Sequence, residues 1–446
     1  MTHPLNNRQM RGAFIAVTSL FFMWGFITVL VDALIPRLKE VFELTFLQAG
    51  LVQFAWFAAY GILSIPGGNL ISKIGYQRGI LIGLATAGIG CLLFYPAAAT
   101  RLYSLFLLAL FVVAGGITIL QVAANPYISV LGPEEGASAR LNLSQAFNSF
   151  GTTLAPLVAA SFLLSDRILD GKAIQALSKN DRLSYYAQEA EAVQVPFVLL
   201  AMAFFLLAAV VGAIKLPQIL RHSSEAFSQS YQVVLKDKKL RFGAIGIFVY
   251  VGAEVALGSY MVNYGLSLDI VEDIQTSPLL GGMASLAALI KGIEVSGLDA
   301  KGVLGALLTF YWGGAMIGRF AGSALMQHMS ASKLLGIAAL MALTLIGLSI
   351  ASAGVAALLL VLGVGFFNSI MFPTIFTLAI EDLDEAKPQG SGVLCTAIVG
   401  GAFIPPAVGA IADTQGFAVA FLLPLFCYLY IAWYAGRLVP AQSVQC

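Results

Sequence analysis

Two carboxylates lie inside stretches of sequence that are otherwise apolar. Asp32 belongs to FITVLVDALI, residues 26–35, and Glu254 belongs to FVYVGAEVALG, residues 248–258. A charged side chain in hydrocarbon costs at least a few kcal/mol, so we expect each acid to face a polar cavity. A buried carboxylate can also be neutralised by a proton. Such a group can take up a proton on one side of a membrane and release it on the other.

Uncharged polar side chains accompany the two acids. Gln121 and Asn125 are four residues apart and Gln145 and Asn148 are three apart, so each pair shares one helix face. Amides both donate and accept hydrogen bonds, which suits sugar hydroxyls, and aromatic rings supply the flat surface that a sugar also needs. The alternative is that the amides hydrogen-bond between helices as packing contacts. The predicted sugar-binding residues are Glu254, Gln121, Asn125, Gln145, Asn148, Gln53, Tyr60, Trp312 and Asn368.

The elements that must position these groups are membrane-spanning helices. Of the 446 residues, 59% are hydrophobic and only 11% are charged, and the mean hydropathy is +0.88. This composition excludes an ordinary water-soluble protein. Twelve apolar runs approach the roughly 20 residues that cross the hydrocarbon of a bilayer. The predicted spans are 12–35, 46–66, 79–98, 102–128, 141–165, 193–216, 241–266, 303–326, 333–353, 355–380, 390–412 and 416–437.

The chain contains an internal repeat. AANPYISVL at 123–131 is echoed by MFPTIFTLA at 371–379, and FGTTLAP at 150–156 is echoed by GGAFIPP at 400–406. Asp32 and Glu254 each lie six residues after a phenylalanine, in the first and the seventh span, so the repeat makes them equivalent. We therefore predict an all-α polytopic membrane protein with two pseudo-symmetric six-helix bundles. That architecture is typical of secondary transporters, which bind their substrate between the two bundles.

The repeat and the polar segments predict the domain boundaries. Residues 1–216 form the N-terminal bundle, 217–240 a cytoplasmic linker, and 241–446 the C-terminal bundle. The C-terminal bundle carries an extracellular insertion at about 267–302, whose apolar piece 279–290 is too short to span and is predicted to be an interfacial or capping helix. Lysine and arginine are more frequent in the loops on the side of both termini, which places both termini in the cytoplasm.

Several classes of function are not expected. A net charge of +1 with scattered basic residues does not indicate a nucleic-acid partner. The three histidines lie in the N-terminal tail or at loop edges, and neither a nucleophile motif nor a phosphate-binding loop occurs, so we do not expect an enzyme. The four cysteines show no metal-ligand spacing, and we expect no metal and no cofactor. The expected partners are a monosaccharide and the lipid bilayer, with the chain working as a monomer.

Longer motifs point to a family. With ILQVAANPYISVLGPEEGASARLNLSQAFNSFGTTLAP, YVGAEVALGS, YWGGAMIGRF and FFNSIMFPTIFTLA, the chain resembles the fucose/proton symporter family of the major facilitator superfamily, above all its bacterial glucose/galactose branch. The resemblance implies proton-coupled hexose import across the bacterial inner membrane, with Asp32 carrying the coupling proton. Fucose members have glutamate where this chain has Gln121 and glutamine where it has Glu254. This swap fits the glucose/galactose branch.

Alternative functions stay open at this point. Sodium could replace the proton, because Asp32 and Glu254 offer oxygen ligands, and fucose or another monosaccharide could be the substrate. A drug/proton antiporter of the same fold would favour an apolar cavity, which the amides argue against. A purely structural Asp32 would need a cation at its own depth, and the predicted spans place none there.

Overall fold

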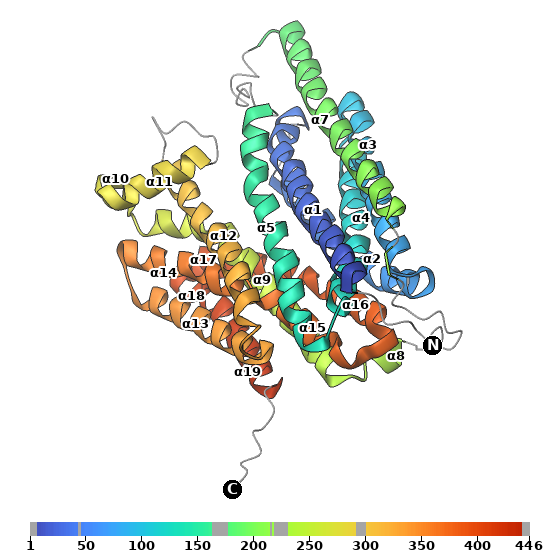
Figure 1. Ribbon diagram of the computed structural model, residues 1–446. Helices are drawn as coiled ribbons and strands as arrows, with labels where there is room; N and C mark the ends of the chain where they lie inside the picture. The colour runs from blue at the N-terminus through green and yellow to red at the C-terminus, as the bar shows by residue number, and fades with distance from the viewer. Residues whose placement is uncertain are drawn as a thin grey trace.

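The computed structural model describes the backbone of residues 7–42, 46–162, 177–214, 216–217, 231–290 and 300–438. The side chains of 7–8, 31–42, 46–50, 156–162 and 290, and some in 179–193, are not among the described ones. Every regular element within the described ranges is a helix (Figure 1).

Six long helices form the N-terminal half. They are α1 (Asn7–Phe42), α2 (Phe46–Ile74), α3 (Tyr76–Thr100), α4 (Tyr103–Val130), α5 (Ala137–Phe162) and α7 (Lys179–Ala213). The C-terminal half has three unbroken spans followed by three that are each divided in two. They are α9 (Lys238–Ser267), α12 (Ala300–Leu325), α13 (Ala331–Ala351), α14 (Gly354–Asn368) with α15 (Met371–Ile380), α16 (Lys387–Thr396) with α17 (Gly400–Gln415), and α18 (Phe417–Ala420) with α19 (Leu422–Leu438). Shorter elements are η1 (Glu134–Gly136), α8 (Tyr231–Val234), α10 (Val271–Thr276), α11 (Pro278–Ile290), η3 (Glu381–Ala386) and η4 (Ala397–Val399).

The predicted all-α membrane architecture is confirmed. Among the described residues, 10 helical segments are long and apolar enough to cross a membrane. One of them, Gly354–Gln415, runs from α14 to α17 and contains two predicted spans, so these segments include eleven of the twelve predicted spans. The twelfth predicted span, 141–165, corresponds to α5. The helices extend past the predicted spans at several ends. For example, α9 begins at Lys238 rather than at 241.

The two halves repeat the same helix pairings. In the N-terminal half α1 packs on α5, α2 on α4, and α3 on both α4 and α7. In the C-terminal half α9 packs on α17, α12 on α14, and α13 on both α14 and α19. Each pairing in one half therefore has its equivalent in the other, as the sequence repeat predicts.

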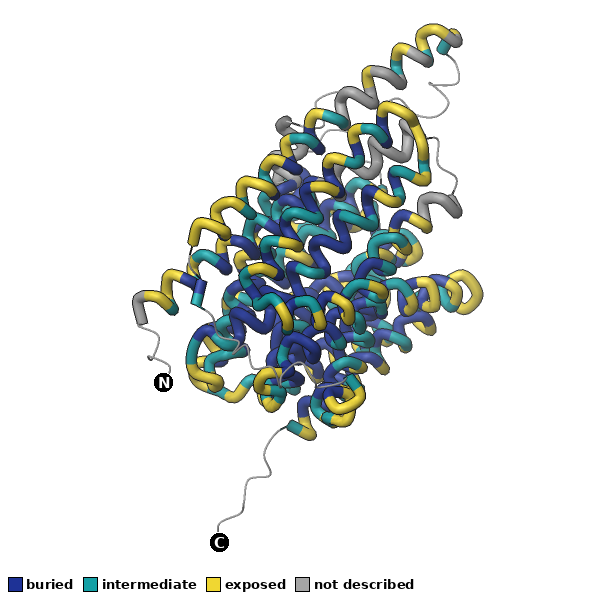
Figure 2. The backbone as a smooth tube through the Cα atoms, turned by 90° about the vertical axis from the view of Figure 1, so that its right-hand side faces the viewer, coloured by how far each residue is buried: buried dark blue, intermediate teal, exposed yellow. Residues whose placement is uncertain are grey.

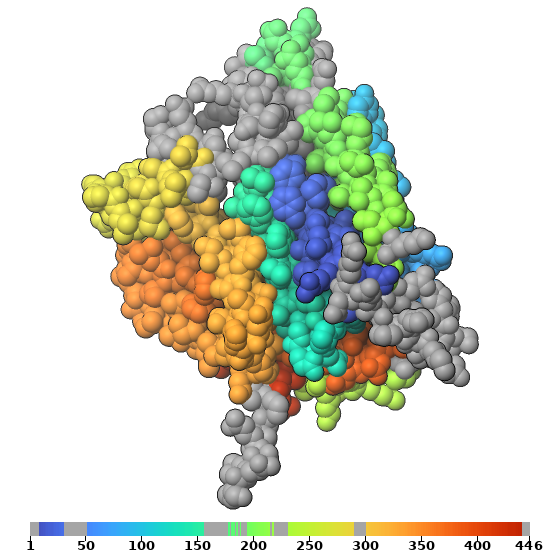
Figure 3. Space-filling view, viewed as in Figure 1, coloured from blue at the N-terminus to red at the C-terminus, as the bar shows by residue number. Residues whose placement is uncertain are grey.

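Two equivalent interfaces join the halves: α2 packs on α16, and α5 packs on α12. We call the end of the molecule with the start of α1, α8 and the end of α19 the closed end, and the opposite end the open end (Figure 1). At the closed end Ser138 Oγ lies 2.6 Å from Thr377 Oγ1, and Lys387 Nζ lies 3.8 Å from Glu134 Oε1. Figure 3 shows α5 and α12 in contact over the lower part of the visible face, with a gap between the halves above.

Buried residues follow the inner faces of both halves (Figure 2). Many large apolar side chains are exposed on the outside of the helices. Leu206 and Ile62, for example, are 66% and 59% exposed. Lipid tails are as apolar as leucine, so such side chains suit a bilayer and would not suit water. The polar groups that matter for function therefore lie between the helices.

The insertion between α9 and α12 contains the short helix that the sequence predicts. α11 has 13 residues, fewer than a membrane span needs. It packs on α12, where Ala287 and Ala288 are buried against Ala306. The opposite face exposes Leu279 and Leu289.

Glycine makes the close crossing of α3 and α4 possible. A Cβ added at Gly83 would lie 2.8 Å from the carbonyl oxygen of Gly116, and a Cβ at Gly116 would overlap the backbone of Ala87. The backbones of α3 and α4 thus touch directly, which is the usual function of small residues at helix interfaces in membranes.

Gly116→Ala should destabilise the protein, because the added methyl group must push α3 and α4 apart. We expect a loss of roughly 1–3 kcal/mol, the usual cost of overpacking a core. Thermal unfolding in detergent measures it. Gly313→Ala in α12 is the control, since no atom lies within 4 Å of its added Cβ. An unfolding temperature for Gly116→Ala equal to that of the control would contradict the described crossing.

Candidate functional site

Glu254 lies on α9 inside the C-terminal half. Tyr250, one turn earlier on the same helix, is fully buried and donates a hydrogen bond to Glu254 Oε1 at 2.7 Å. The glutamate side chain is half-buried and lies within electrostatic range of Arg319 on α12. The carboxylate therefore has one neutral donor and one cation near it. Among the described residues no donor occupies its second oxygen, Oε2, which can accept a further hydrogen bond.

Arg319 is a residue of the candidate site that the sequence-based prediction missed. Its Nε donates to the carbonyl of Ser369 at 3.0 Å. Its Nη1 donates to Ser149 Oγ and to the carbonyl of Gln145, the latter at 3.4 Å. Ser369 belongs to the same half as Arg319, but Gln145 and Ser149 lie on α5, so the guanidinium joins the two halves inside the predicted span 303–326. An arginine within a span was the signal that could have revealed it.

A proline explains why the carbonyl of Ser369 is available. Proline lacks an N–H, so Pro373 leaves the carbonyl four residues earlier without its helical donor. In the other half Pro126 does the same to the carbonyl of Val122, which accepts a hydrogen bond from Ser391 Oγ of α16 at 2.9 Å. The two prolines that the repeat relates therefore create two acceptors inside the membrane, and a polar side chain satisfies each.

The C-terminal half holds a second hydrogen-bonded pair that includes a tyrosine, here with an asparagine. Asn368 is fully buried and donates to Tyr311 Oη at 2.8 Å. Trp312 follows on α12, with its ring edge-on to that of Tyr311 and its indole against Gly258 of α9. Trp312 is 45% exposed, so it offers the accessible aromatic surface that the sequence predicts, whereas Asn368 is covered in this conformation.

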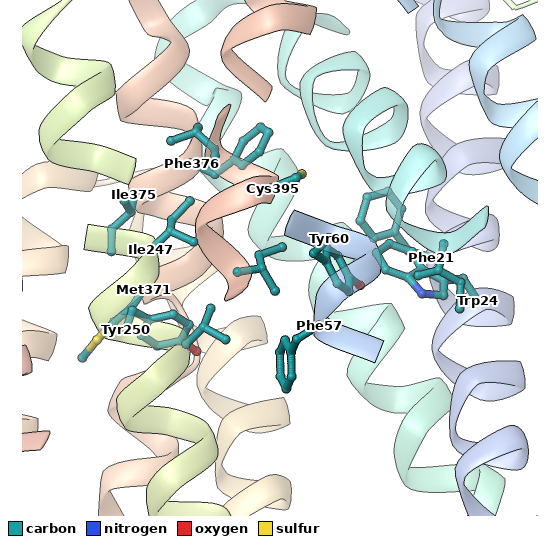
Figure 4. Close-up of a cluster of buried hydrophobic side chains, with 14 of the residues drawn as sticks. Phe21, Trp24, Phe57, Tyr60, Ile247, Tyr250, Met371, Ile375, Phe376 and Cys395 are labelled. Atoms are coloured by element: carbon teal, nitrogen blue, oxygen red, sulfur yellow. The ribbon is translucent and has the colours of Figure 1, made fainter. Parts of the chain in front are cut away.

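The N-terminal half mirrors this chemistry. Gln121 Nε2 on α4 donates to Tyr60 Oη on α2 at 2.6 Å. Figure 4 shows Tyr60 and Phe57 between the α1 aromatics, Phe21 and Trp24, and the C-terminal half. A tyrosine–amide pair on this side thus lies across from the tyrosine–carboxylate pair on α9.

Other predicted site residues have structural contacts. Asn148 Nδ2 donates to the carbonyl of Phe21 at 2.9 Å, which fastens α5 to α1. The Gln145 side chain is buried, and the backbone carbonyl of Gln145 accepts a hydrogen bond from Arg319. Gln53 is exposed on α2.

Two predicted residues fall elsewhere. Asn125 is fully buried where α4 meets α16 of the other half, beside the contact of Ser391 with Val122. The side chain of Asp32 lies outside the described residues, and only its place on α1 is given. The role of Asp32 therefore stays a prediction.

Two helix bundles with buried polar and charged groups between them define a membrane transporter of the two-bundle class. The chain belongs to the Major Facilitator Superfamily, whose sequence profile matches residues 13–406. It is 45% identical to the glucose/galactose transporter of Brucella abortus over 422 residues, which cover 95% of this chain and 93% of that one. It is 33% identical to the L-fucose-proton symporter of Escherichia coli, with 95% and 92% of the two chains covered.

A solved structure agrees with the fold. A Major Facilitator Superfamily transporter crystallised in the outward conformation superposes with a TM-score of 0.84 at 32% identity, over 95% of this chain and 98% of that one. The resemblance found in the motifs is thus confirmed, and identity is higher to the glucose/galactose transporter than to the fucose symporter.

Arg319→Ala should destabilise the protein, because it leaves the carbonyls of Ser369 and Gln145 without this donor and removes the cation near Glu254. We expect a loss of roughly 1.5–3 kcal/mol, the usual value of a hydrogen bond to a charged group. Arg319→Lys keeps the charge but not the planar fork, and should lose less. Thermal unfolding in detergent compares both with Lys301→Ala, an exposed change on α12. If Arg319→Ala unfolds at the same temperature as Lys301→Ala, the contacts described for Arg319 do not contribute to stability.

Proposed function

We propose that this chain is a sugar/proton symporter that imports a hexose, glucose or galactose, by alternating access. The observation that carries the proposal is that each half holds a hydrogen-bonded polar pair, Tyr60–Gln121 in one and Tyr250–Glu254 in the other. The halves are in contact at the closed end, where Ser138 meets Thr377. The names of the relatives, one for glucose and galactose and one for fucose with protons, support it. Such a protein moves its substrate without changing it chemically, so no enzyme activity is part of the proposal.

The proposed setting is the bacterial inner membrane, with both termini in the cytoplasm. The closed end, which carries the start of α1 and the end of α19, would then face the cytoplasm. The described conformation would be open to the outside, and the likeness to a relative in the outward conformation supports this orientation. The sugar would enter at the open end and leave after the halves rock about their interface. One chain contains both halves, so a monomer suffices.

Asp32 is proposed to carry the coupling proton. One proton driven by about 100 mV supplies roughly 2.3 kcal/mol, which corresponds to about 50-fold accumulation of a neutral sugar. Glu254 is proposed to bind the sugar. As a carboxylate beside a single tyrosine donor, it can accept hydrogen bonds from sugar hydroxyls, and charge-assisted bonds are roughly twice as strong as neutral ones.

Uptake into sealed proteoliposomes tests the function. Labelled glucose, galactose and fucose are offered in turn, first with a proton gradient and then with a sodium gradient. Accumulation of glucose or galactose under the proton gradient alone supports the proposal. Accumulation that needs sodium would replace the coupling ion, and no accumulation of any of the three sugars would refute sugar symport.

Asp32→Asn should retain exchange of sugar across the membrane but lose accumulation driven by a proton gradient. An amide can rock together with the sugar, but it cannot carry a proton. Counterflow and gradient-driven uptake in proteoliposomes measure the two activities. Asp269→Asn at the end of α9 is the matched control, because Asp269 has a φ of 53°, which asparagine also tolerates. Full accumulation by Asp32→Asn would remove Asp32 from the coupling role.

Glu254→Gln should weaken sugar binding and leave the proton-to-sugar ratio unchanged. Losing a hydrogen bond to a charged group costs roughly 1.5–3 kcal/mol, so the dissociation constant should rise about tenfold to a hundredfold. Calorimetry measures the binding and proteoliposome assays measure the ratio. Asp32→Asn should show the reverse pattern, with binding kept and coupling lost. Unaltered affinity together with a lost or halved ratio would make Glu254 a proton carrier instead.

A further inference from the structure

Polar atoms without partners gather between the halves, on the side of the Tyr60–Gln121 pair that faces the closed end. Within the part of the chain that the structure describes, Asn125 Oδ1 and Nδ2, Ser64 Oγ and Gln389 Oε1 have no hydrogen-bond partner. Asn125 and Ser64 are 0% exposed and Gln389 is 4% exposed. Buried polar groups are nearly always hydrogen-bonded, so a cluster of exceptions requires an explanation.

Contacts between the helices place the residues that carry these atoms in one region. Ser391 Oγ on α16 donates to the carbonyl of Val122 on α4, which fixes how the two antiparallel helices face each other. Toward the closed end, Asn125 comes three residues after Val122 on α4, and Gln389 comes two residues before Ser391 on α16. At a rise of about 1.5 Å per residue, both lie within roughly one helical turn of that contact.

The second helix of the N-terminal half approaches the same point. A Cβ added at Gly392 of α16 would lie 2.7 Å from the carbonyl oxygen of Ser64, and one added at Gly68 would lie 3.4 Å from the Cα of Gln389. Ser64 also lies one turn from Tyr60 on α2, just as Asn125 lies one turn from Gln121 on α4. The partnerless atoms therefore form the next layer below the tyrosine–amide pair.

The polar line continues to a cavity. Ser129 is one turn beyond Asn125, and its Oγ donates to the backbone carbonyl of Asn125 at 2.9 Å. Ser129 also lines a cavity of about 180 Å³ between the halves at the closed end, together with Ser138, Thr377 and Lys387. Polar groups thus follow one path from the Tyr60–Gln121 pair to the closed end of the molecule.

Separation of α4 from α16 would change what these groups contact. The carbonyl of Val122, which Pro126 deprives of its helical donor, would lose Ser391. Irregular backbone inside a membrane is tolerated where it lines a water-filled cavity. Once the closed end opens, the freed carbonyl and the amides would face such a cavity, and hydroxyl groups could satisfy them.

We propose that Asn125, Gln389 and Ser64, with the carbonyl of Val122, form a second hydroxyl-binding site on the exit side, which holds the sugar on its way out after the closed end opens. The ligand is a monosaccharide, so the proposal rests on the proposed function. Asn125 then belongs to this exit-side site and not to the sugar-binding residues at the centre. In the closed arrangement the same groups lack partners, which keeps the closed end from becoming too stable to open.

Asn125→Leu and Gln389→Met test the site in the full-length protein, one in each half. Both changes remove partnerless polar atoms at similar side-chain volume, so they favour the closed arrangement and leave the opened path without its hydrogen bonds. We expect hexose binding in detergent to stay within about twofold of the unmodified protein, and counterflow exchange in proteoliposomes to slow at least tenfold. Asn125→Gln and Gln389→Asn keep the amide and should restore most of the exchange.

Thr118→Val is the matched control. Thr118 is fully buried on α4 like Asn125, but its hydroxyl donates to the Ala114 carbonyl within its own helix, so exchange should remain normal. Normal exchange by both Asn125→Leu and Gln389→Met would overturn the exit site. Loss of hexose binding in Asn125→Leu would also overturn it, by returning Asn125 to the central site. Gln389→Met decides the matter if Asn125→Leu does not fold. A failure of the unmodified protein to bind hexose would instead refute the proposed function.

Discussion

Backbone carbonyls that lose their helical donors impose the constraint around which the centre of this protein is organised. Water is absent from the core of a bilayer, so each freed carbonyl needs a partner inside the protein. Pro126 frees the carbonyl of Val122 and Pro373 frees that of Ser369. Ser391 satisfies the first and Arg319 the second. A hydroxyl from the opposite half and a cation that also reaches the opposite half are thus drawn to equivalent places.

This arrangement gives the contact between the halves its chemical character. The halves meet through hydroxyls, the amide of Asn142, one long ion pair and the guanidinium of Arg319, in addition to close backbone contacts at glycines and apolar contacts such as that of Phe147 with Phe320. Hydrogen bonds of this kind each contribute about 1 kcal/mol net, and water can replace them when the interface opens. Within each half, the helices pack mainly through buried apolar side chains. We therefore expect the halves to separate from each other more easily than the helices within one half.

The sequence predicted the architecture well because its signal is carried by long segments. Apolar runs, the proline motifs and the repeated spacing of Asp32 and Glu254 each involve many residues, and they define twelve spans in two related halves. Glu254 was singled out for a similar reason, since an acid in an apolar run requires a polar environment. The surroundings of single side chains were harder to predict. Asn125 and Gln121 share a helix face, yet Gln121 reaches Tyr60 while Asn125 is covered by α16 of the other half.

Which partner covers a helix face depends on the crossing of helices far apart in sequence, and no local pattern reports it. Arg319 shows the complementary difficulty. Its role depends on a carbonyl that a proline releases in another helix, so the relevant signal is divided between α12 and α15. The polar residues of a candidate site can therefore be listed from the sequence, but the fold is needed to tell which of them suit sugar binding, helix packing or contact between the halves.

α11 has a mechanical consequence. It lies at the open end of the C-terminal half and is anchored to α12 through Ala287 and Ala288, with Leu279 and Leu289 pointing away from the protein. We expect a short apolar helix in that position to rest at the boundary between headgroups and hydrocarbon. It would then fix the height of one half relative to the membrane surface. For the proposed rocking of the halves, we therefore expect lipids with longer or shorter chains to shift the balance between the two conformations.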